Sequence, residues 1–305
     1  MTTVVLVTST VLVLSAVVVG VVRPPGGAGL LRRWGIVELD GDKARTASRY
    51  LRERRVLTLV VMVPALVVVS TLWVNVSTYE LLSEASMYLV LGSVLVSMLV
   101  AEWWAGLRRP QASTRVAVLR RRRVSDLVPT YALVLYLAMT ALAIAADVAG
   151  SVVRPWAQRM LQRSPPPAER ERPFLAGDLY RDLAAIPPDW PFLAGTAACL
   201  AAVAGVVWLA VTRPMATEDD RVDAVLRARS ARVAVGLGTA LTATITQAAL
   251  ARLRPQSFLF VQGAPDWVTT AGTALYWVTV LVWPLGIVIW IWVTTPPRRR
   301  LARTP

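Results

Sequence analysis

The sequence predicts an all-α, polytopic membrane protein with seven transmembrane helices, built as a single transmembrane domain over residues 1–305. Composition is the first observation: hydrophobic residues make up 55% of the chain and charged residues only 17%, with a mean hydropathy of +0.53. The second is the arrangement of the apolar residues, which form runs of about 20, enough to cross a hydrocarbon core of roughly 30 Å. The third is the concentration of Lys and Arg between alternate runs.

Each of these runs is expected to be helical, because in lipid a helix satisfies the backbone N–H and C=O groups of its own segment. The predicted spans lie at about 3–22, 56–75, 85–106, 127–148, 190–212, 233–251 and 268–293. The first span lacks the basic segment that opens a secretory signal peptide, and its positive charges follow it. We therefore interpret it as a membrane anchor whose amino terminus lies outside.

The orientation of the chain follows from the distribution of its basic residues. One set of connections holds 25 of the 33 Lys and Arg residues: 23–55, 107–126, 213–232 and 294–305. The intervening connections hold the other eight: 76–84, 149–189 and 252–267. Acidic residues divide almost evenly between the two sets, so the bias is specific to basic residues. The positive-inside rule therefore predicts an N-out/C-in topology.

Two connections are long enough to contain structure of their own. The predicted cytoplasmic loop 23–55 includes a short basic helix over 38–55, in which acidic residues come first and basic residues last, as the helix dipole favours. We expect this helix to run directly into the second span. The predicted external loop 149–189 has two interpretations, a simple connection or a lid over an outward-facing cavity.

Short phrases recur at the ends of the spans, and they predict parallel helix-hairpin repeats. Pro188-Asp189-Trp190 and Pro265-Asp266-Trp267 open spans five and seven, and Ala-Gly-Thr follows each at the same distance. Spans four and six are expected to end at Val153-Arg154-Pro155 and Leu253-Arg254-Pro255. Spans three and four therefore read as a copy of spans five and six, running in the same direction. Arg-Pro alone is also explained as punctuation, in which Pro stops the helix and Arg reaches the headgroups.

The inventory of reactive side chains excludes several classes of function. The chain has no His and one Cys, which excludes His-based catalytic centres, His metal sites and thiolate clusters as they are ordinarily built. Cys199 is interpreted as a small core residue of the fifth span. The only Lys, Lys43, lies in a predicted cytoplasmic loop, so the chain lacks the Schiff-base Lys of seven-helix retinal proteins. A Gly-rich phosphate loop is also lacking. We therefore expect no ATPase, no other enzymatic activity, no cofactor and no metal site.

One hexapeptide resembles a known signature. Asp40-Gly41-Asp42-Lys43-Ala44-Arg45 resembles the opening of the CDP-alcohol phosphatidyltransferase signature, Asp-Gly-x-x-Ala-Arg. The resemblance implies a lipid-headgroup transferase whose carboxylates hold divalent metals. In that family a Gly and two further Asp residues follow on the same helix, whereas the matching positions here carry Arg54, Thr58 and Met62. The other interpretation of the hexapeptide is a helix start.

Polar residues within the spans are the candidates for a functional path. Glu102 lies near the predicted cytoplasmic end of span three, and two roles are open for it. If buried, its carboxylate either pairs with an Arg of the 108–123 loop or gates a path; otherwise it reaches the membrane interface. Span six places polar groups on neighbouring turns: Thr239, Thr242, Thr246 and Gln247. They form either a polar permeation stripe or ordinary hydrogen bonds to their own backbone or a neighbouring helix.

The densest basic cluster comprises Arg120, Arg121, Arg122 and Arg123. It is interpreted either as a topology determinant that contacts anionic headgroups or as a docking site for a cytoplasmic partner. The formal net charge of +14 does not predict nucleic-acid binding, because the basic residues lie in the short loops that set topology.

Together these features predict a non-ATPase integral membrane component of a transport or export assembly, energised by partner subunits, with an unassigned substrate. The alternative is a scaffold or sensor subunit that binds a partner protein, and a lipid-headgroup transferase is the more distant alternative. The expected partners are membrane lipids and other membrane or cytoplasmic subunits. Because 32 of the 33 basic residues are Arg, we expect a GC-rich genome and a bacterial inner membrane.

Overall fold

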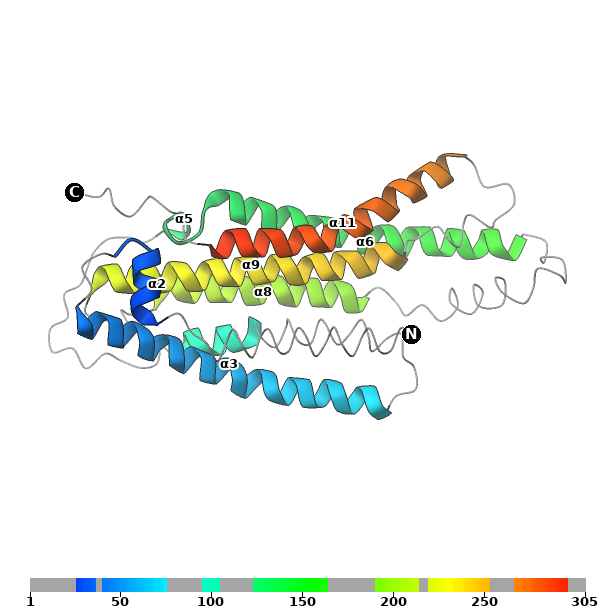
Figure 1. The fold of residues 1–305 in the computed structure, drawn as a ribbon. Helices are drawn as coiled ribbons and strands as arrows, with labels where there is room; N and C mark the ends of the chain where they lie inside the picture. The colour runs from blue at the N-terminus through cyan, green and yellow to red at the C-terminus, as the bar shows by residue number, and fades with distance from the viewer. Residues whose placement is uncertain are drawn as a thin grey trace. The chain divides into compact units, whose positions relative to one another are not determined.

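The computed structural model describes residues 26–36, 40–75, 95–104, 123–163, 190–213, 219–252 and 266–295 (Figure 1). Within these ranges every regular element is an α helix and none is a β strand. The predicted first span, 3–22, lies outside the described residues. The all-helical class that the sequence predicts is therefore confirmed for the described part of the chain.

Four of these helices are long and apolar enough to cross a membrane. They are α6 (Thr130–Arg163), α8 (Trp190–Thr212), α9 (Asp220–Arg252) and α11 (Asp266–Thr294). Two further helices overlap predicted spans: α3 (Gly41–Asn75) covers 56–75, and the helix Leu95–Trp104 lies within 85–106. The protein is therefore a helical protein suited to a membrane.

Some helix bounds agree closely with the spans that the sequence predicts. The bounds of α8 are those of the predicted span 190–212, and α11 begins within two residues of the predicted 268. α3 is one continuous helix, so the predicted basic helix runs directly into the predicted second span. Pro64 lies inside α3 without ending it.

Two helices extend beyond the predicted spans. α6 was expected to end at Val153-Arg154-Pro155 but continues to Arg163, so the first part of the predicted external loop is helical. A proline removes one backbone donor from a helix, and neighbouring groups in a bundle can tolerate that loss. α9 begins at Asp220, well before the predicted 233, so most of the predicted loop 213–232 is helical.

The described residues belong to two compact units. Unit 1 comprises Met1–Ala132, Ala202–Leu237 and Ile291–Pro305, and unit 2 comprises Leu133–Ala201 and Gly238–Trp290. α6, α8, α9 and α11 each contribute one end to unit 1 and the other part to unit 2. Unit 1 also contains α3, the helix Leu95–Trp104 and two short helices, α2 (Gly27–Arg33) and α5 (Val124–Leu127).

Small residues allow the helices of unit 2 to approach closely. A Cβ added to Gly286 of α11 would lie 2.4 Å from the Cβ of Ala243 on α9, so the two backbones are nearly in contact. Around this contact Met139, Ala146, Leu250 and Val282 form a buried apolar cluster with Ala243. Close approach through Gly and Ala is the usual way in which membrane helices gain packing energy without a hydrophobic driving force.

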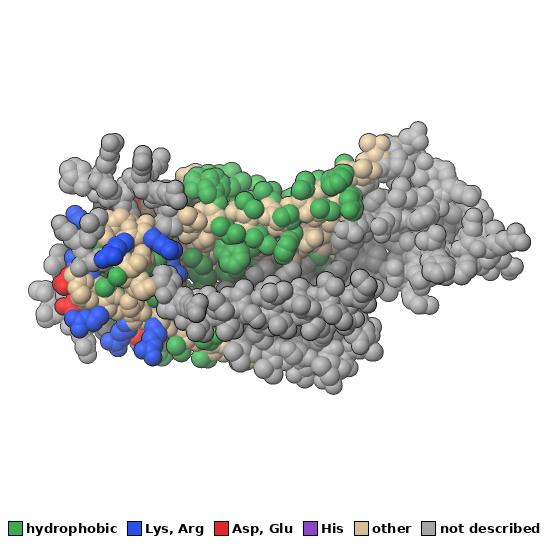
Figure 2. Space-filling model, viewed as in Figure 1, with side chains coloured by type: hydrophobic (Ala, Val, Ile, Leu, Met, Phe, Trp, Pro, Cys, Tyr) green, Lys and Arg blue, Asp and Glu red, His purple; other side chains and the backbone are tan. Residues whose placement is uncertain are grey.

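Large apolar side chains occupy the outer faces of the same helices. On α11, Leu281, Leu285 and Val288 are 58%, 50% and 60% exposed, and apolar side chains run along this helix in Figure 2. On α6, Val134 and Leu137 are similarly exposed. Apolar faces of this extent are unfavourable in water and are suited to lipid.

In unit 1, α2 crosses α3 at a steep angle (Figure 1) and is held there by Gly27. The backbone N–H of Gly27 donates to Oγ of Ser48 at 2.9 Å, and Ser48 in turn donates to the carbonyl of Ala44 at 2.8 Å. A Cβ on Gly27 would lie 2.5 Å from that carbonyl oxygen. Only glycine therefore permits this contact.

Candidate functional site: a buried arginine–carboxylate network

Unit 1 contains a network of five ionisable side chains with almost no exposure to solvent. Its members are Arg54 of α3, Glu102 of the helix Leu95–Trp104, Arg213 directly after α8, and Asp223 and Arg227 of α9. Glu102, Arg213 and Asp223 have side chains that are 0% exposed. The network therefore ties four helical segments together through charge.

Glu102 is shared by cations from two different segments. One carboxylate oxygen forms an ion pair with Nη2 of Arg54 and lies 3.5 Å from the hydroxyl of Tyr50, which donates to it. The other oxygen lies 3.4 Å from Nη1 of Arg213. Arg54 also donates to the hydroxyl of Ser230 on α9. Glu102 thus bridges α3 and the end of α8.

Asp223 links the same arginine to α9. One of its carboxylate oxygens lies 3.9 Å from Nη2 of Arg213, and the other accepts from Nε of Arg227 at 2.5 Å. Arg227 donates through Nη1 to the carbonyl oxygens of Ala210 and Val211, at 3.0 and 3.4 Å. These carbonyls belong to the last turn of α8, where the helix dipole favours a cation.

The network holds three cations and two anions, so it buries a net charge of +1. Two of its cations face the ring of Tyr50: the guanidinium carbons of Arg54 and Arg213 lie 4.5 and 5.3 Å from the ring centroid. An aromatic face stabilises a partly desolvated cation. Within the described residues, none of the three nitrogens of Arg213 donates a hydrogen bond, and its two ion pairs are long. Arg213 is therefore the most loosely held member.

Burial changes the acidity of the most peripheral arginine. Desolvation lowers the pKa of Arg54 to about 10, with the neighbouring charge of Arg213 adding to the effect and Tyr50 opposing it. Arg54 nevertheless stays protonated at neutral pH. The network therefore keeps its cationic excess under physiological conditions.

A second arginine junction lies nearby in unit 1. Nε of Arg232 on α9 donates to the carbonyl of Leu127 at the end of α5, at 3.2 Å. Its guanidinium carbon lies 5.0 Å from the ring centroid of Trp34, the residue that follows α2. α9 is thereby connected to two short helices through one cation.

The sequence identified only one member of the network as a site residue. Glu102 was expected either to pair with an Arg of the 108–123 loop or to reach the interface. Its side chain is fully buried instead of reaching outward, and its cationic partners among the described residues are Arg54 and Arg213. Residues 105–122 lie outside the described residues. The side chain of Arg213 is buried, so at this Arg-Pro pair the arginine does not reach the headgroups, as the alternative explanation of the Arg-Pro phrases would require.

The polar residues of span six form ordinary helix contacts. Thr239, Thr242 and Thr246 are fully buried, and Gln247 is half-buried. The hydroxyl of Thr246 donates to the carbonyl of Thr242 at 2.8 Å, and the hydroxyl of Thr242 lies 3.6 Å from Sγ of Cys199 on α8. These contacts match the second of the two predicted roles, hydrogen bonds within the helix and to its neighbour. The permeation stripe stays a prediction.

The predicted docking cluster lies mostly outside the described residues, which resume at Arg123. Arg123 is exposed, and its backbone N–H donates to Oδ2 of Asp126 at 3.0 Å, which caps α5. Neither interpretation of Arg120–Arg123 is tested by this contact.

The hexapeptide that resembles the phosphatidyltransferase signature lies at the start of α3. Asp42 is exposed and pairs with Arg45 at 2.6 Å, and Lys43 pairs with Asp219 at 2.8 Å. In the described part of the chain, no three His, Cys, Asp or Glu side chains lie close enough together to hold a metal ion. The carboxylates present therefore do not fit the dinuclear centre that the resemblance implies.

Comparison of the chain with protein-family models, curated proteins and solved structures finds no match. The function of the protein is therefore inferred from its own residues.

Proposed function

We propose that the chain is a seven-span, N-out/C-in component of a transport or export assembly in a bacterial inner membrane, without an ATPase of its own. In this role it works with partner subunits that supply the energy. The buried network around Glu102 carries the proposal, because ionisable side chains are costly to bury, and a cluster of them where predicted spans meet cytoplasmic connections is a candidate functional site. A purely structural junction of the same volume would be at least as stable if it were apolar.

The network has the properties of an element with two arrangements. Arg213 makes two long ion pairs and no hydrogen bond within the described residues, so a small displacement of α8 can exchange its partners at low cost. Arg227, by contrast, holds Asp223 and the last turn of α8 tightly. Alternating access requires such helices to shift relative to one another around a charged site.

The division of the chain into units supports the proposed orientation. Among the described residues, the basic residues of the connections predicted to be cytoplasmic fall in unit 1, and those of the connections predicted to be external, Arg154, Arg159, Arg163 and Arg252, fall in unit 2. Helices that alternate in direction would produce this pattern.

One observation supports the predicted parallel repeat and another does not. α8 begins at Trp190 and α11 at Asp266, so both helices start at a Pro-Asp-Trp phrase, as a repeat requires. The extension of α6 beyond Arg154-Pro155 removes the expected match between the ends of spans four and six.

Topology is tested by labelling introduced cysteines in whole cells with a membrane-impermeant reagent. A probe at Ser164 should label from outside, and one at Ser113 only after permeabilisation. Native Cys199 is buried and gives little background. The reversed pattern would overturn the orientation.

The transport role is tested by identifying the partner that co-purifies with the full-length chain. An ATPase partner, with hydrolysis that changes in the Glu102→Gln and Glu102→Asp variants, is the expected result. Glu53→Gln is the matched control, because Glu53 is a carboxylate of α3 in an exposed pair with Arg49. A stable partner without nucleotide activity would instead favour the scaffold or sensor role.

A further inference from the structure

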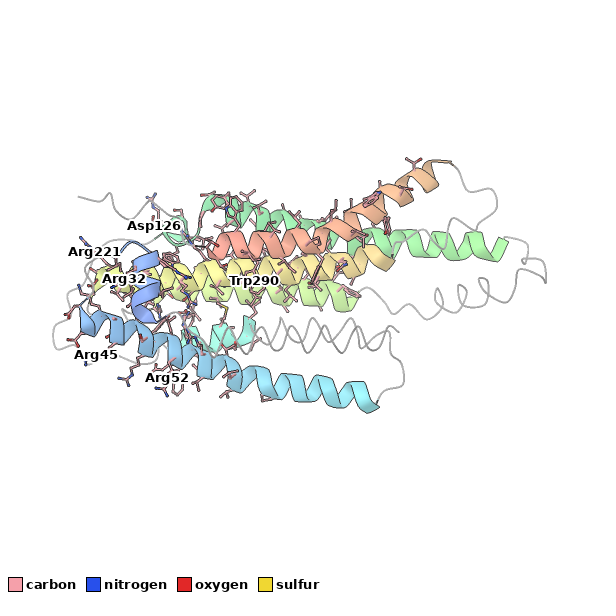
Figure 3. The ribbon with its side chains drawn as sticks, viewed as in Figure 1. Arg32, Arg45, Arg52, Asp126, Arg221 and Trp290 are labelled. Carbon is pink, nitrogen blue, oxygen red and sulfur yellow. The ribbon has the colours of Figure 1, made fainter. Side chains whose placement is uncertain are left out.

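The outer face of α3 carries basic and apolar residues in sequence along one stripe. Its members, in order along the helix, are Arg45, Arg49, Arg52, Val56 and Val60, and all five are exposed. At about 100° per residue, the five positions fall within an arc of about 80° around the helix axis. Arg45 and Arg52 project from the side of α3 away from α2 (Figure 3).

The stripe changes from charged to apolar within one helical turn. The side chains of Arg45 and Arg49 are each 81% exposed. One turn beyond Arg52 the exposed residues are apolar: Val56 is 52% exposed and Val60 is 61% exposed. One turn corresponds to about 5.4 Å of helix. A boundary this sharp is the signature of a membrane surface, with guanidinium groups among the headgroups and valines among the acyl chains.

We propose that this stripe, Arg45 to Val60 on the outer face of α3, binds anionic phospholipids of the cytoplasmic leaflet. The guanidinium groups of Arg45, Arg49 and Arg52 contact the headgroup phosphates, and Val56 and Val60 contact the acyl chains of the same lipids. Arginine suits this role because its planar donors match the oxygens of a phosphodiester in pairs. A soluble partner would leave the exposed valines uncovered, so the continuity of the stripe favours a lipid.

The carboxylates beside the stripe do not prevent this contact. Arg45 pairs with Asp42 and Arg49 with Glu53, but Asp42 is 78% exposed and Glu53 is 38% exposed. Ion pairs at such exposure contribute little, so a lipid phosphate can replace the carboxylate or join it. Arg52 has no ion pair among the described residues and is, of the three stripe arginines, the nearest to the valines. We therefore assign the principal phosphate contact to Arg52.

The opposite face of α3 explains why this helix carries a lipid stripe at this depth. Arg54 lies about 160° from the centre of the stripe and joins the buried network through Glu102. The network and the charged-to-apolar boundary therefore lie at the same level of one helix. A lipid bound to the stripe holds α3 at one depth in the membrane. It thereby holds Arg54, on the opposite face of α3, at the level of Glu102.

The test measures phospholipids retained by the detergent-purified, full-length protein, using native mass spectrometry. Phosphatidylglycerol and phosphatidylcholine are titrated separately, and glycerol phosphate is added as a headgroup without acyl chains. We expect the wild type to retain phosphatidylglycerol preferentially. The variant Arg45→Gln, Arg49→Gln, Arg52→Gln should lose about tenfold in affinity for phosphatidylglycerol, since each arginine near an anionic surface contributes a few-fold and the two carboxylates reduce the sum.

A matched control removes the same charge from elsewhere in unit 1. Arg32, Arg33 and Arg221 are exposed and lie outside the stripe, and their triple change to Gln should leave retention unchanged. Val56→Ser with Val60→Ser should reduce retention of both lipids equally. If the triple stripe variant does not fold, Arg52→Gln alone should still lower affinity about threefold.

Several results would overturn the proposal. Equal retention by the wild type and the stripe variants would show that these arginines do not contact lipid. An equal loss of phosphatidylglycerol affinity in the control variant would show that retention depends only on the net charge of the protein. Competition by glycerol phosphate as strong as that by the lipid would indicate a site for soluble phosphate, and loss of a protein partner with unchanged lipid retention would assign the stripe to that partner.

Discussion

Unit 1 and unit 2 join their helices in two different ways. In unit 1 several long-range contacts run through arginine, as in the Glu102 network and the junction of Arg232 with Leu127 and Trp34. In unit 2 they run through small residues, as where Gly286 meets Ala243, and through weak polar contacts such as that between Cys199 and Tyr136, at 3.8 Å. Ionic contacts have few alternative geometries, each well separated, whereas small-residue packing resists any displacement. We therefore expect the arginine contacts of unit 1 to exchange partners more readily than the small-residue contacts of unit 2.

The largest effect should come from removing the shared carboxylate of unit 1. Glu102→Gln leaves Arg54 and Arg213 buried without their common anion, and breaking a buried pair in this way costs about 3–5 kcal/mol. Reversible unfolding in mixed micelles measures the loss. Glu53→Gln, which removes the charge of a carboxylate that pairs with the exposed Arg49, should cost less than about 0.5 kcal/mol.

A double variant separates the charge of Glu102 from its volume. Adding Arg54→Gln to Glu102→Gln removes one orphaned cation, so the double variant should be more stable than the sum of the two single losses indicates. If the losses in stability of the two single variants simply add, the side chains of Arg54 and Glu102 are not directly coupled. Ionic contacts would then no longer distinguish unit 1 from unit 2.

The next largest effect should appear in unit 2 on adding a single methyl group. The Cβ of Gly286→Ala would lie 2.4 Å from the Cβ of Ala243, and overpacking of this kind costs about 1–3 kcal/mol. Ala243→Gly should restore most of the stability when combined with Gly286→Ala. Failure of that rescue would show that the two helices do not meet at this point.

These two regions also differ in how well the sequence predicts them. The apolar run and its length were sufficient to predict α8 with its observed bounds, because a membrane-spanning helix depends on local composition. The network was not predictable in the same way. Arg54, Glu102 and Arg213 are far apart in the sequence, and no local pattern joins them. Arg213 in particular had a complete local explanation, an Arg-Pro helix end, that its buried position overrides.

One part of the network did carry a local signal. Asp223 and Arg227 are four residues apart, the spacing at which acidic and basic side chains meet on one helix face. This spacing is typical of a helix through 220–232. The density of basic residues in the same segment led instead to the prediction of a loop. The end of α6 failed for the converse reason, since Pro155 was treated as a stop although a helix in a bundle can continue through proline.

A smaller effect is expected at the polar contact of unit 2. Thr242→Val keeps the side-chain shape and removes the hydroxyl that lies 3.6 Å from Sγ of Cys199. Interhelical hydrogen bonds in membranes average about 0.6 kcal/mol, so the free energy of unfolding should fall by less than about 1 kcal/mol. A loss comparable to that of Glu102→Gln would erase the contrast between the units. A change in transport at constant stability would instead favour the polar stripe.

The smallest effect should come from the ion pair at the edge of unit 1, and it should depend on pH. Asp219 caps α9, accepting from the N–H groups of Arg221 and Val222 at 2.8 and 3.2 Å, and it pairs with Lys43 at 2.8 Å. Burial raises the pKa of Asp219, but the hydrogen bonds from Lys43 and the two backbone groups outweigh it, so the pKa lies below its ordinary value. A carboxylate whose pKa is lowered by folding stabilises the fold at pH values above the pKa that it has in the unfolded chain. This stabilisation disappears as the pH falls from about 4 through the pKa of the folded state.

Asp219→Asn keeps the cap and removes the charge. Because Lys43 is 37% exposed, the loss at neutral pH should be only about 0.5 kcal/mol. Unfolding measured across the pH range should show the wild type and the variant converging in acid; a difference that persists below pH 3 would assign the effect to the cap and not to the ion pair.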